Sequence, residues 1–371
     1  MASIAFQQVT KTYDRHTVAV SDLTLEVPDG QFLVLVGPSG CGKTTTLRLV
    51  AGLETPTSGA IHIGAKPVAD VSPRDRNVAM VFQDGALYPH MDVYANMAFA
   101  LRMKRLSATE ARRRVVAAAE MLGIASLLHR KSAALSGGER RRVALGRAMV
   151  REPAAFLLDE PLSSLDPLLQ GALRTELKAL HQRLATTTLY VTHDQAEAMA
   201  LGQRIGVLHH GRLQQVGSPD DIYRRPANRF VAGFFGMPPM NFLTARVRRQ
   251  HEGLSLEIAG AGFDLPAPLR SSLAGHVGPT VLAGIRPHDL SLKPRTGPGG
   301  DALSGKVTHI EPLGSRCDVH VQLHSGEKCV VCTAPDSVPR VGADVSLHID
   351  PDRLHLFEPD GTCRNIRDVA V

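Results

Sequence analysis

Tryptophan is missing from this sequence of 371 residues, and aromatic residues make up only 4% of it. Long hydrophobic runs are missing too. QFLVLVG and AAFLLDE are typical apolar runs, far short of the roughly 20 residues that a membrane-spanning helix needs. The first residues, MASIAFQQVTK, contain no basic region followed by an apolar core, so they do not resemble a secretory signal. We therefore expect a chain that stays in the cytoplasm unless a partner holds it elsewhere.

Cysteine is scarce as well. The five cysteines, an odd number, do not form a disulfide framework and indicate a reducing compartment. Cys329 and Cys332 form a C-x-x-C pair inside a predicted short strand, where positions three apart face opposite sides. No second pair or histidine cluster accompanies them in the sequence. This favours buried or half-buried thiols over a zinc or redox site.

Basic residues outnumber acidic ones, which gives a net charge of +6 and a pI near 9.2. Such a balance suits nucleic acid, an anionic membrane surface or a nucleotide site. Because aromatic residues are few and no RNA-binding signature is present, the charge by itself does not choose among these. The basic runs Arg112–Arg114 and Arg140–Arg142 lie on predicted helices and are interpreted as solvated faces.

Up to about residue 235, short apolar runs alternate with helical stretches, which predicts an α/β domain with a largely parallel sheet. The predicted buried strands are FLVLVG, NVAMVFQ, AAFLLDE, TTLYVTH and RIGVLHHG. A helical insertion is expected over about residues 84–150, where Ser107 and Glu110 predict a capping box and Gly123 the end of the same helix. Several strands end in a polar residue, at the edge where ligands gather in open α/β sheets.

Beyond the segment FVAGFFGMPPMNFL, the pattern changes to short alternating runs separated by glycine and proline. Evenly spaced short strands of this kind predict a small β-barrel or sandwich. We place the boundary near residues 236–240, which gives an α/β domain over residues 1–236 and a β-rich domain over residues 240–371.

A glycine-rich loop between a predicted strand and a predicted helix carries the first chemical motif. VGPSGCGKTT matches G-x-x-x-x-G-K-[ST] at Gly37, Gly42, Lys43 and Thr44. The glycines let the backbone wrap closely around phosphates, the lysine reaches the β- and γ-phosphates, and the threonine hydroxyl is a ligand for Mg²⁺. The motif predicts a nucleotide site.

The segment AFLLDEP supplies carboxylates for the same edge of the sheet. Asp159 ends the predicted strand and is expected to orient Mg²⁺, and Glu160 follows it. Hydrolysis needs a group that holds and deprotonates the attacking water, a task that suits a carboxylate at a strand end. The alternative is that both acids only cap the turn before Pro161. Beside a phosphate loop, the catalytic interpretation is preferred.

Three further residues are candidates at or near this edge. His193 ends the predicted strand TTTLYVTHD and can bridge the γ-phosphate and Glu160, although a lone histidine is more often structural. Gln83 ends NVAMVFQ and can hydrogen-bond Mg²⁺ or the water. Tyr13 can stack on adenine through its ring face, although a turn tyrosine is just as often simply packed.

The segment ALSGGERRRVALGRAMVREP opens a predicted helix with Ser136, Gly137 and Gly138. Bare N–H groups at such a helix end are an anion site. No lysine or threonine stands directly beside these glycines to complete a phosphate pocket.

The phosphate loop, Gln83, LSGGE, LLDEP, SSLD and His193, in this order, resemble the ATP-binding subunits of ATP-binding-cassette transporters. YVTHDQAEAMAL, VGSPDDIYRRPANRFVAGFFG and GIRPHDL are similar to the maltose-transporter ATPase group, and the resemblance covers nearly the whole chain. That group serves carbohydrate importers, including those for malto-oligosaccharides, trehalose and sn-glycerol-3-phosphate. The resemblance implies an ATPase with a regulatory C-terminal domain of oligonucleotide-binding-like barrels (TOBE-type).

The resemblance also implies a role for each matching residue. Tyr13 becomes the adenine-stacking residue, and Gln83 the residue that couples ATP to the membrane subunits. Glu160 becomes the catalytic base, His193 the switch, and Asp166 part of a loop that crosses between subunits. The remaining ATP contacts belong to the phosphate loop and to the segment LSGGE, the signature of the family. They are Gly37, Pro38, Ser39, Gly40, Cys41, Gly42, Lys43, Thr44 and Thr45 of the loop and Ser136, Gly137 and Gly138 of the signature.

Two positions depart from the family pattern. Glu139 stands where glutamine is usual, and Gly85 stands where the sugar-importer group often carries tyrosine. A carboxylate close to a helix N-terminus interacts favourably with the helix dipole, and we expect Glu139 to point away from the γ-phosphate.

The implied partners are a second copy or a paralogous ATPase, two transmembrane permease subunits, an extracytoplasmic solute-binding protein and a regulatory protein at the C-terminal domain. The ATPase is expected to be peripheral, on the cytoplasmic face of the cell membrane, with no nucleic acid bound.

The alternative is a soluble cassette ATPase that acts on nucleic acid or ribosomes. DNA-repair members carry long coiled coils and translation members carry two cassettes, and neither feature is present in this sequence. The resemblance also implies that the cargo is chosen largely by other chains.

Overall fold

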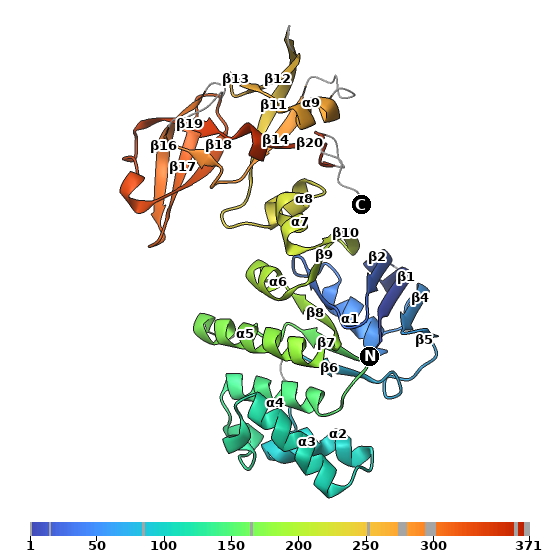
Figure 1. Ribbon diagram of the computed structural model, residues 1–371. Helices are drawn as coiled ribbons and strands as arrows, with labels where there is room; N and C mark the ends of the chain where they lie inside the picture. Colours follow the sequence, from blue (N-terminus) through green and yellow to red (C-terminus); the bar gives the residue numbers. More distant parts are fainter. Residues whose placement is uncertain are drawn as a thin grey trace. The chain divides into compact units, whose positions relative to one another are not determined.

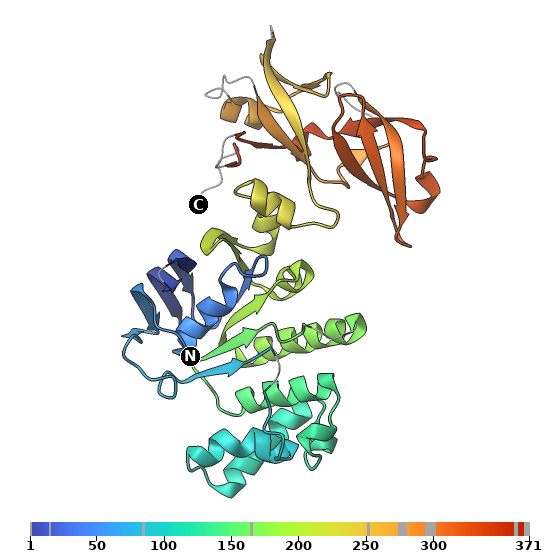
Figure 2. The same cartoon turned by 180° about the vertical axis from the view of Figure 1, so that it is seen from behind.

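The computed structural model describes residues 2–14, 16–83, 86–163, 166–250, 253–273, 280–293, 302–359 and 363–366. The chain divides into two compact units, Met1–Pro219 and Asp220–Val371, drawn from two sides in Figures 1 and 2. The domain boundary near residues 236–240 stays a prediction.

A six-stranded sheet forms the centre of the first unit, with the strand order β10-β9-β3-β8-β7-β6. Its strands are β3 (Phe32–Val36), β6 (Val78–Val81), β7 (Ala155–Asp159), β8 (Thr187–Thr192), β9 (Arg204–His209) and β10 (Arg212–Gly217). All pairings are parallel except that of β9 with β10. Every residue of β3, β7 and β8 is buried, as in parallel sheets that are covered on both faces. The five strands predicted from apolar runs are confirmed.

A second, antiparallel sheet has the strand order β2-β1-β4-β5. Its strands are β1 (Ile4–Tyr13), β2 (Thr17–Val27), β4 (Ser58–Ile63) and β5 (Lys66–Pro67). Helix α1 (Lys43–Ala51) packs between this sheet and the central one. Phe6 of β1, Leu47 of α1 and Leu157 of β7 belong to a single buried cluster. The shared core holds the loop between β3 and α1 in place.

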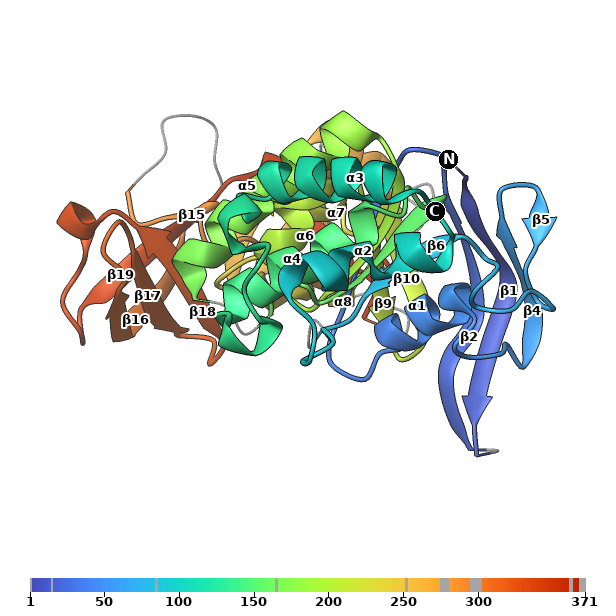
Figure 3. The same ribbon diagram turned by 90° about the horizontal axis from the view of Figure 1, so that it is seen from below.

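Three helices lie between β6 and β7 in the chain and pack against one another, on the side of the first unit that faces the viewer in Figure 3. They are α2 (Val93–Met103), α3 (Ala108–Met121) and α4 (Gly137–Met149), with short 3-10 helices at Ala125–Leu127 and Ser132–Ala134. Two more helices, α5 (Pro167–Leu184) and α6 (Gln195–Leu201), follow β7 and β8.

Only half of the capping box predicted for α3 forms. The Ser107 side chain accepts a hydrogen bond from the Glu110 backbone N–H at 3.3 Å. The Glu110 carboxylate does not return to Ser107, because it pairs with Arg113 and Arg114 at 2.7 Å. Gly123 follows the helix with a φ of 64°, the left-handed conformation that glycine adopts readily at helix ends.

The second unit consists mainly of two antiparallel five-stranded sheets. The first has the order β13-β12-β11-β14-β20, with β11 (Asn241–Gln250), β12 (Gly253–Ile258), β13 (Ala261–Asp264), β14 (Val281–Ile285) and β20 (His355–Phe357). The second has the order β15-β19-β16-β17-β18, with β15 (Leu290–Ser291), β16 (Leu303–Pro312), β17 (Cys317–Leu323), β18 (Lys328–Thr333) and β19 (Asp344–Ile349). Side chains of both sheets, such as Leu243 and Val319, share one core. The β-rich architecture predicted for this part of the chain is confirmed.

Short helices complete the second unit. They are α7 (Pro219–Arg224), α8 (Arg229–Phe234) and α9 (Ala267–Leu273), with 3-10 helices at Pro335–Ser337 and Pro351–Arg353. Arg286 follows β14 and is 3% exposed; its guanidinium donates to the backbone carbonyls of Phe235, at 2.6 Å, and Tyr223. The Tyr223 ring also stacks 3.6 Å from that guanidinium. These contacts attach α7 and α8 to the β-rich unit.

The C-x-x-C pair lies on β18. Cys329 is buried, whereas Cys332 is half-buried and donates from Sγ to Asp318 Oδ1 at 3.2 Å. Burial raises the pKa of both thiols to about 12. Both side chains are therefore neutral thiols near pH 7, and the described residues contain no cluster of three or more side chains able to hold a metal ion.

Across the described part of the chain, we find no helix whose length and apolar character would let it cross a membrane.

Candidate active site

Three glycines shape the loop between β3 and α1. A Cβ atom at Gly37 would lie 2.1 Å from the Leu208 carbonyl oxygen, and one at Gly42 would lie 2.2 Å from the Ala19 carbonyl oxygen. Gly40 has a φ of 78°, and a Cβ atom there would meet no described atom within 4 Å. Gly37 and Gly42 therefore let the loop approach the protein closely, whereas Gly40 leaves space beside the backbone for a ligand.

The N-terminus of α1 is open to an anion. Gly42 is its N-cap, and among the described residues no side chain caps it and no acidic residue occupies its first turn. Lys43 is 5% exposed, and its Nζ donates to the carbonyl oxygens of Gly37 and Pro38, each at 2.8 Å. Uncapped backbone N–H groups next to an ammonium group are what a phosphate site requires.

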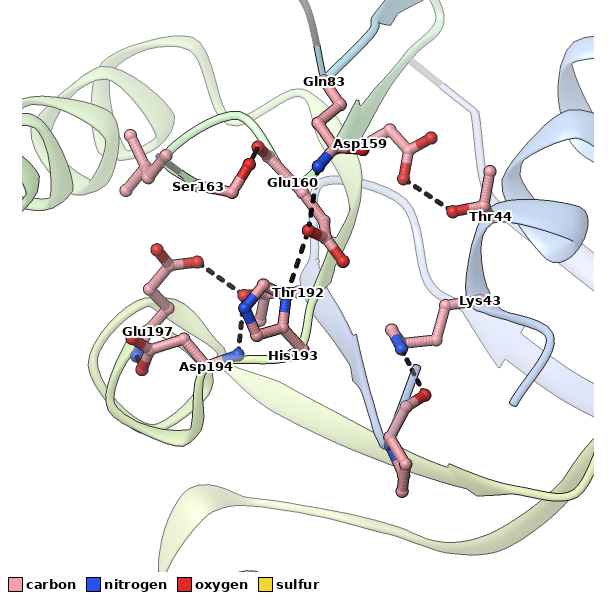
Figure 4. A network of polar contacts seen from close by, with 12 residues as sticks. Lys43, Thr44, Gln83, Asp159, Glu160, Ser163, Thr192, His193, Asp194 and Glu197 are labelled. Atoms are coloured by element: carbon pink, nitrogen blue, oxygen red, sulfur yellow. Dashed lines mark hydrogen bonds and ion pairs between the residues drawn. The ribbon is translucent and has the colours of Figure 1, made fainter. Parts of the chain in front are cut away.

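Thr44 and Asp159 form a pair of hard oxygen donors on neighbouring elements. Thr44 Oγ1 donates to Asp159 Oδ1 at 3.0 Å (Figure 4). Asp159 is 6% exposed, and burial raises the pKa of its carboxyl, while the hydrogen bond from Thr44 opposes that shift. A buried carboxylate beside a hydroxyl is a donor set that suits Mg²⁺, which commonly takes one or two carboxylates together with phosphate oxygens. These two residues fit the predicted metal.

Glu160, His193 and Gln83 meet at one carboxylate oxygen. His193 Nδ1 lies 3.0 Å from Glu160 Oε2, and Gln83 Nε2 lies 3.5 Å from the same atom (Figure 4). The Glu160 side chain is 16% exposed and that of His193 is 54% exposed, so the pair sits at the mouth of a cleft. A carboxylate oriented by an imidazole and an amide is well placed to take a proton from water.

The backbone of Glu160 is strained. Its φ is 44°, a left-handed conformation that costs a non-glycine residue about 1–3 kcal/mol. Surrounding hydrogen bonds maintain it: Glu160 N donates to the Val191 carbonyl at 2.9 Å, and Ser163 Oγ donates to the Glu160 carbonyl at 2.9 Å. Strain of this kind clusters at functional sites, where it aims a side chain.

The phosphate loop and the Glu160 group border one cleft of about 520 Å³, a size typical of small-molecule sites. Its described lining residues are Ala19, Ser39, Gly40, Gly42, Lys43, Thr44, Thr45, Gln83, Glu160 and His193. The Cys41 side chain, which also belongs to the loop, is buried, and its Sγ lies 3.6 Å from Lys43 Nζ. Tyr13 is not part of this lining, and Lys11 Nζ lies 4.8 Å from its ring centroid.

A second cavity of about 630 Å³ adjoins the first and shares Thr44 and Gln83 with it. Its other described lining residues are Arg48, Phe82, Gly137, Arg140, Arg141 and Asp159. Arg140 is exposed, but Arg141 is half-buried. The interpretation of this arginine run as a merely solvated face is therefore incomplete, since two of its members line a cavity next to the nucleotide cleft.

The signature segment starts α4 with a complete capping box. Ser136 Oγ accepts from the Glu139 backbone N–H at 3.3 Å, and Glu139 Oε2 accepts from the Ser136 backbone N–H at 2.7 Å. The Ser136 hydrogen bond lowers the pKa of the Glu139 carboxyl below its ordinary value. The Glu139 carboxylate thus folds back onto its own helix end.

Two other positions singled out in the sequence are Asp166 and Gly85. Asp166 is the N-cap of α5, with Oδ1 accepting from the Leu169 backbone N–H at 3.0 Å. Gly85 lies outside the described residues, as do Ser164 and Leu165 of the SSLD segment.

Sequence reasoning missed several residues around the site. Ala19 and Arg48 line the two cavities but belong to no motif considered. Glu197 is 3% exposed and accepts hydrogen bonds from Tyr190 and from Thr192. Thr192 is the residue directly before His193. The signal that could have found Glu197 is the presence of hydroxyl side chains, Tyr190 and Thr192 among them, in the predicted buried strand TTLYVT, because buried hydroxyls need hydrogen-bond partners.

Both units match known family models. The ABC transporter model covers residues 20–163, the MalK OB fold domain covers residues 236–290, and the TOBE domain covers residues 283–357. The first unit is therefore an ATPase of the ATP-binding-cassette class, and the predicted fold, a cassette followed by an OB- and TOBE-type β-rich part, is confirmed.

Whole-chain relatives define the family more closely. The trehalose/maltose import ATP-binding protein MalK of Thermococcus litoralis is 47% identical, over 96% of this chain and 98% of that protein. The sn-glycerol-3-phosphate import ATP-binding protein UgpC of Pectobacterium atrosepticum is 45% identical, over 98% and 99%. The chain belongs to the MalK- and UgpC-like family of ATP-binding, ATP-hydrolysing subunits of ABC importers.

A solved structure supports the cassette fold. The structure described as dimeric MJ0796, a bacterial ABC transporter cassette, is 30% identical and superposes with a TM-score of 0.54. The match covers 58% of this chain and 98% of the other.

Proposed function

We propose that this chain powers the import of a carbohydrate or a related solute through separate membrane permease subunits, from the cytoplasmic face of the membrane. The observation that carries the proposal is the cleft in which Lys43, Glu160 and His193 meet, within a chain that aligns end to end with import ATPases. A solute-binding protein outside the membrane would select the cargo. The β-rich residues 240–371 would regulate the ATPase and receive a regulatory protein.

The site residues divide the work of hydrolysis. The N–H groups of the loop and the Lys43 ammonium bind the phosphates of ATP and orient the γ-phosphate. Thr44 and Asp159, together with Gln83, would hold Mg²⁺, which neutralises charge on the phosphate oxygens when bound. Glu160 Oε2 takes the proton of the attacking water, and His193 keeps that carboxylate in place. Tyr13 would stack on adenine.

The working unit we propose is a dimer, of two copies or with a paralogous ATPase. Gly137 lines the adjoining cavity, but none of the signature residues Ser136–Gly138 belongs to the described lining of the chain's own phosphate-loop cleft. The start of α4 would therefore bind a γ-phosphate that a partner subunit holds. The loop that contains Asp166 would cross between the two subunits. The solved MJ0796 cassette is described as dimeric, in line with this arrangement.

Replacing Glu139 by glutamine is expected to change the ATPase rate by no more than about fivefold, the span of an exposed charge interaction worth up to about 1 kcal/mol. The reason is that Oε2 already bonds the Ser136 N–H at 2.7 Å, a contact that a glutamine oxygen can make equally well. Steady-state ATPase assays of both proteins measure this. A many-fold rise in the variant would mean that the carboxylate faces the γ-phosphate and repels it.

Uptake assays test the proposed transport. In a strain that lacks this gene, uptake of labelled trehalose, maltodextrin or sn-glycerol-3-phosphate should be lost for at least one solute. The wild-type gene should restore it, and the Glu160→Gln variant should not. Affinity purification from membranes in which the protein is abundant should recover integral permease subunits. Their absence would contradict the proposal.

A further inference from the structure

His193 stands at an exposed point of the chain. It follows the last residue of β8 and precedes the N-cap residue of α6, and its side chain is 54% exposed. Packing therefore contributes little to its orientation. Its contact with Glu160 Oε2, at 3.0 Å, depends on how the short turn from Thr192 to Asp194 is held.

The Glu197 side chain stabilises that turn through hydrogen bonds. Its Oε2 accepts hydrogen bonds from Thr192 Oγ1 at 2.7 Å and from Tyr190 Oη at 2.8 Å, both on β8 (Thr192 and Glu197 are drawn in Figure 4). Thr192 Oγ1 in turn accepts from the Asp194 backbone N–H at 3.0 Å. The chain of bonds closes on itself, because Asp194 Oδ1 accepts from the Glu197 backbone N–H at 3.0 Å. Thr192 thus bonds the Glu197 carboxylate directly, and Asp194 reaches that carboxylate through the Thr192 hydroxyl.

The network is buried, and that makes it stiff. Glu197 is 3% exposed, Tyr190 is fully buried and Thr192 is 2% exposed. Inside a protein, polar groups that lose a partner cost about 1–3 kcal/mol each, so alternative positions of the turn are strongly disfavoured. Burial raises the pKa of the Glu197 carboxyl, and the hydrogen bonds from Thr192 and Tyr190 oppose that rise.

We propose that Glu197 is a positioning residue for ATP hydrolysis, which acts through Thr192 and Asp194 to hold His193 against Glu160. Glu197 itself does not line the described nucleotide cleft. This inference rests on the proposed role of His193 and adds the group that makes the switch rigid. It predicts that removing the carboxylate slows turnover while ATP still binds.

The test compares Glu197→Ala with Glu197→Gln in the full-length chain. The alanine variant should lose between about tenfold and a hundredfold in kcat, the range that a misplaced catalytic group produces, with KM for ATP and affinity for an ATP analogue within about twofold. The glutamine variant should recover most of the rate, because its amide oxygen can accept from both hydroxyls. If the alanine variant does not fold, Thr192→Val, which keeps the side-chain shape, should show the same loss in kcat.

A double-mutant cycle with His193→Ala separates a positioning role from general destabilisation. If Glu197 acts through His193, Glu197→Ala should add little to the residual loss of the His193→Ala protein. Fully multiplicative losses, or wild-type kcat in Glu197→Ala while His193→Ala is impaired, would overturn the inference. Wild-type turnover in His193→Ala would instead refute the proposed role of His193 and remove the basis of the inference.

Discussion

Glu160→Gln is expected to lower kcat for ATP hydrolysis by a factor of about 10²–10⁴, the contribution that a positioned general base makes. The amide keeps the shape of the side chain but cannot take a proton from the attacking water. ATP binding should persist, because the phosphate loop and Lys43 are unchanged. Steady-state hydrolysis and fluorescence titration with an ATP analogue measure the two effects separately.

The same variant should accumulate as an ATP-bound form of the proposed dimer, if that dimer opens only after hydrolysis. Size-exclusion chromatography with and without ATP would reveal the shift. Glu152→Gln is the matched control, because that side chain is 69% exposed and pairs with Arg114 on the helical part of the unit. Wild-type turnover in Glu160→Gln would refute its role as the base.

Lys43→Ala should abolish measurable ATP binding and, with it, hydrolysis. The Lys43 ammonium is buried between the Gly37 and Pro38 carbonyls, at 2.8 Å from each, so the variant loses the one cation on the described wall of the cleft. Without it, the phosphate oxygens face two carbonyl dipoles of the wrong sign. A charge-assisted hydrogen bond contributes about 1.5–3 kcal/mol, and several phosphate contacts change at once.

Lys178→Ala removes the same charge at a distance from the cleft and is the control for this variant. Its Nζ donates to the Ala200 carbonyl at 3.0 Å on an exposed part of α5, so binding should stay at the wild-type level. Nucleotide affinity measured by calorimetry distinguishes the two. Unchanged affinity in Lys43→Ala would mean that the loop does not bind phosphate.

Local pattern was sufficient for the elements that build the site. The apolar runs that end in Gln83, Asp159 and His193 correspond to β6, β7 and β8, because buried parallel strands require continuous apolar residues. The glycine spacing of the phosphate loop also predicted its place between β3 and α1. Both signals depend only on residues that are close in sequence.

Side-chain direction was harder to predict. The Glu110 carboxylate left its expected cap for Arg113 and Arg114, because two charged partners bind it better than one backbone N–H. Glu139, with a similar spacing from its serine, did return to the Ser136 N–H. Sequence spacing is the same in the two cases, so the nearby partners decide.

Taken alone, the sequence determined the class of chemistry: a loop that binds phosphates, a strand end that carries acids, and the order of motifs that marks an importer ATPase. Tertiary structure decided which atoms meet. The neighbouring order of β6, β7 and β8 brings Gln83, Glu160 and His193 to one oxygen, although Gln83 and Glu160 are 77 positions apart. It also bonded the Glu197 carboxylate to Thr192, the residue that precedes the histidine. Such contacts depend on which strands pair and on what each buried polar group finds beside it, and residues far apart in the chain supply both.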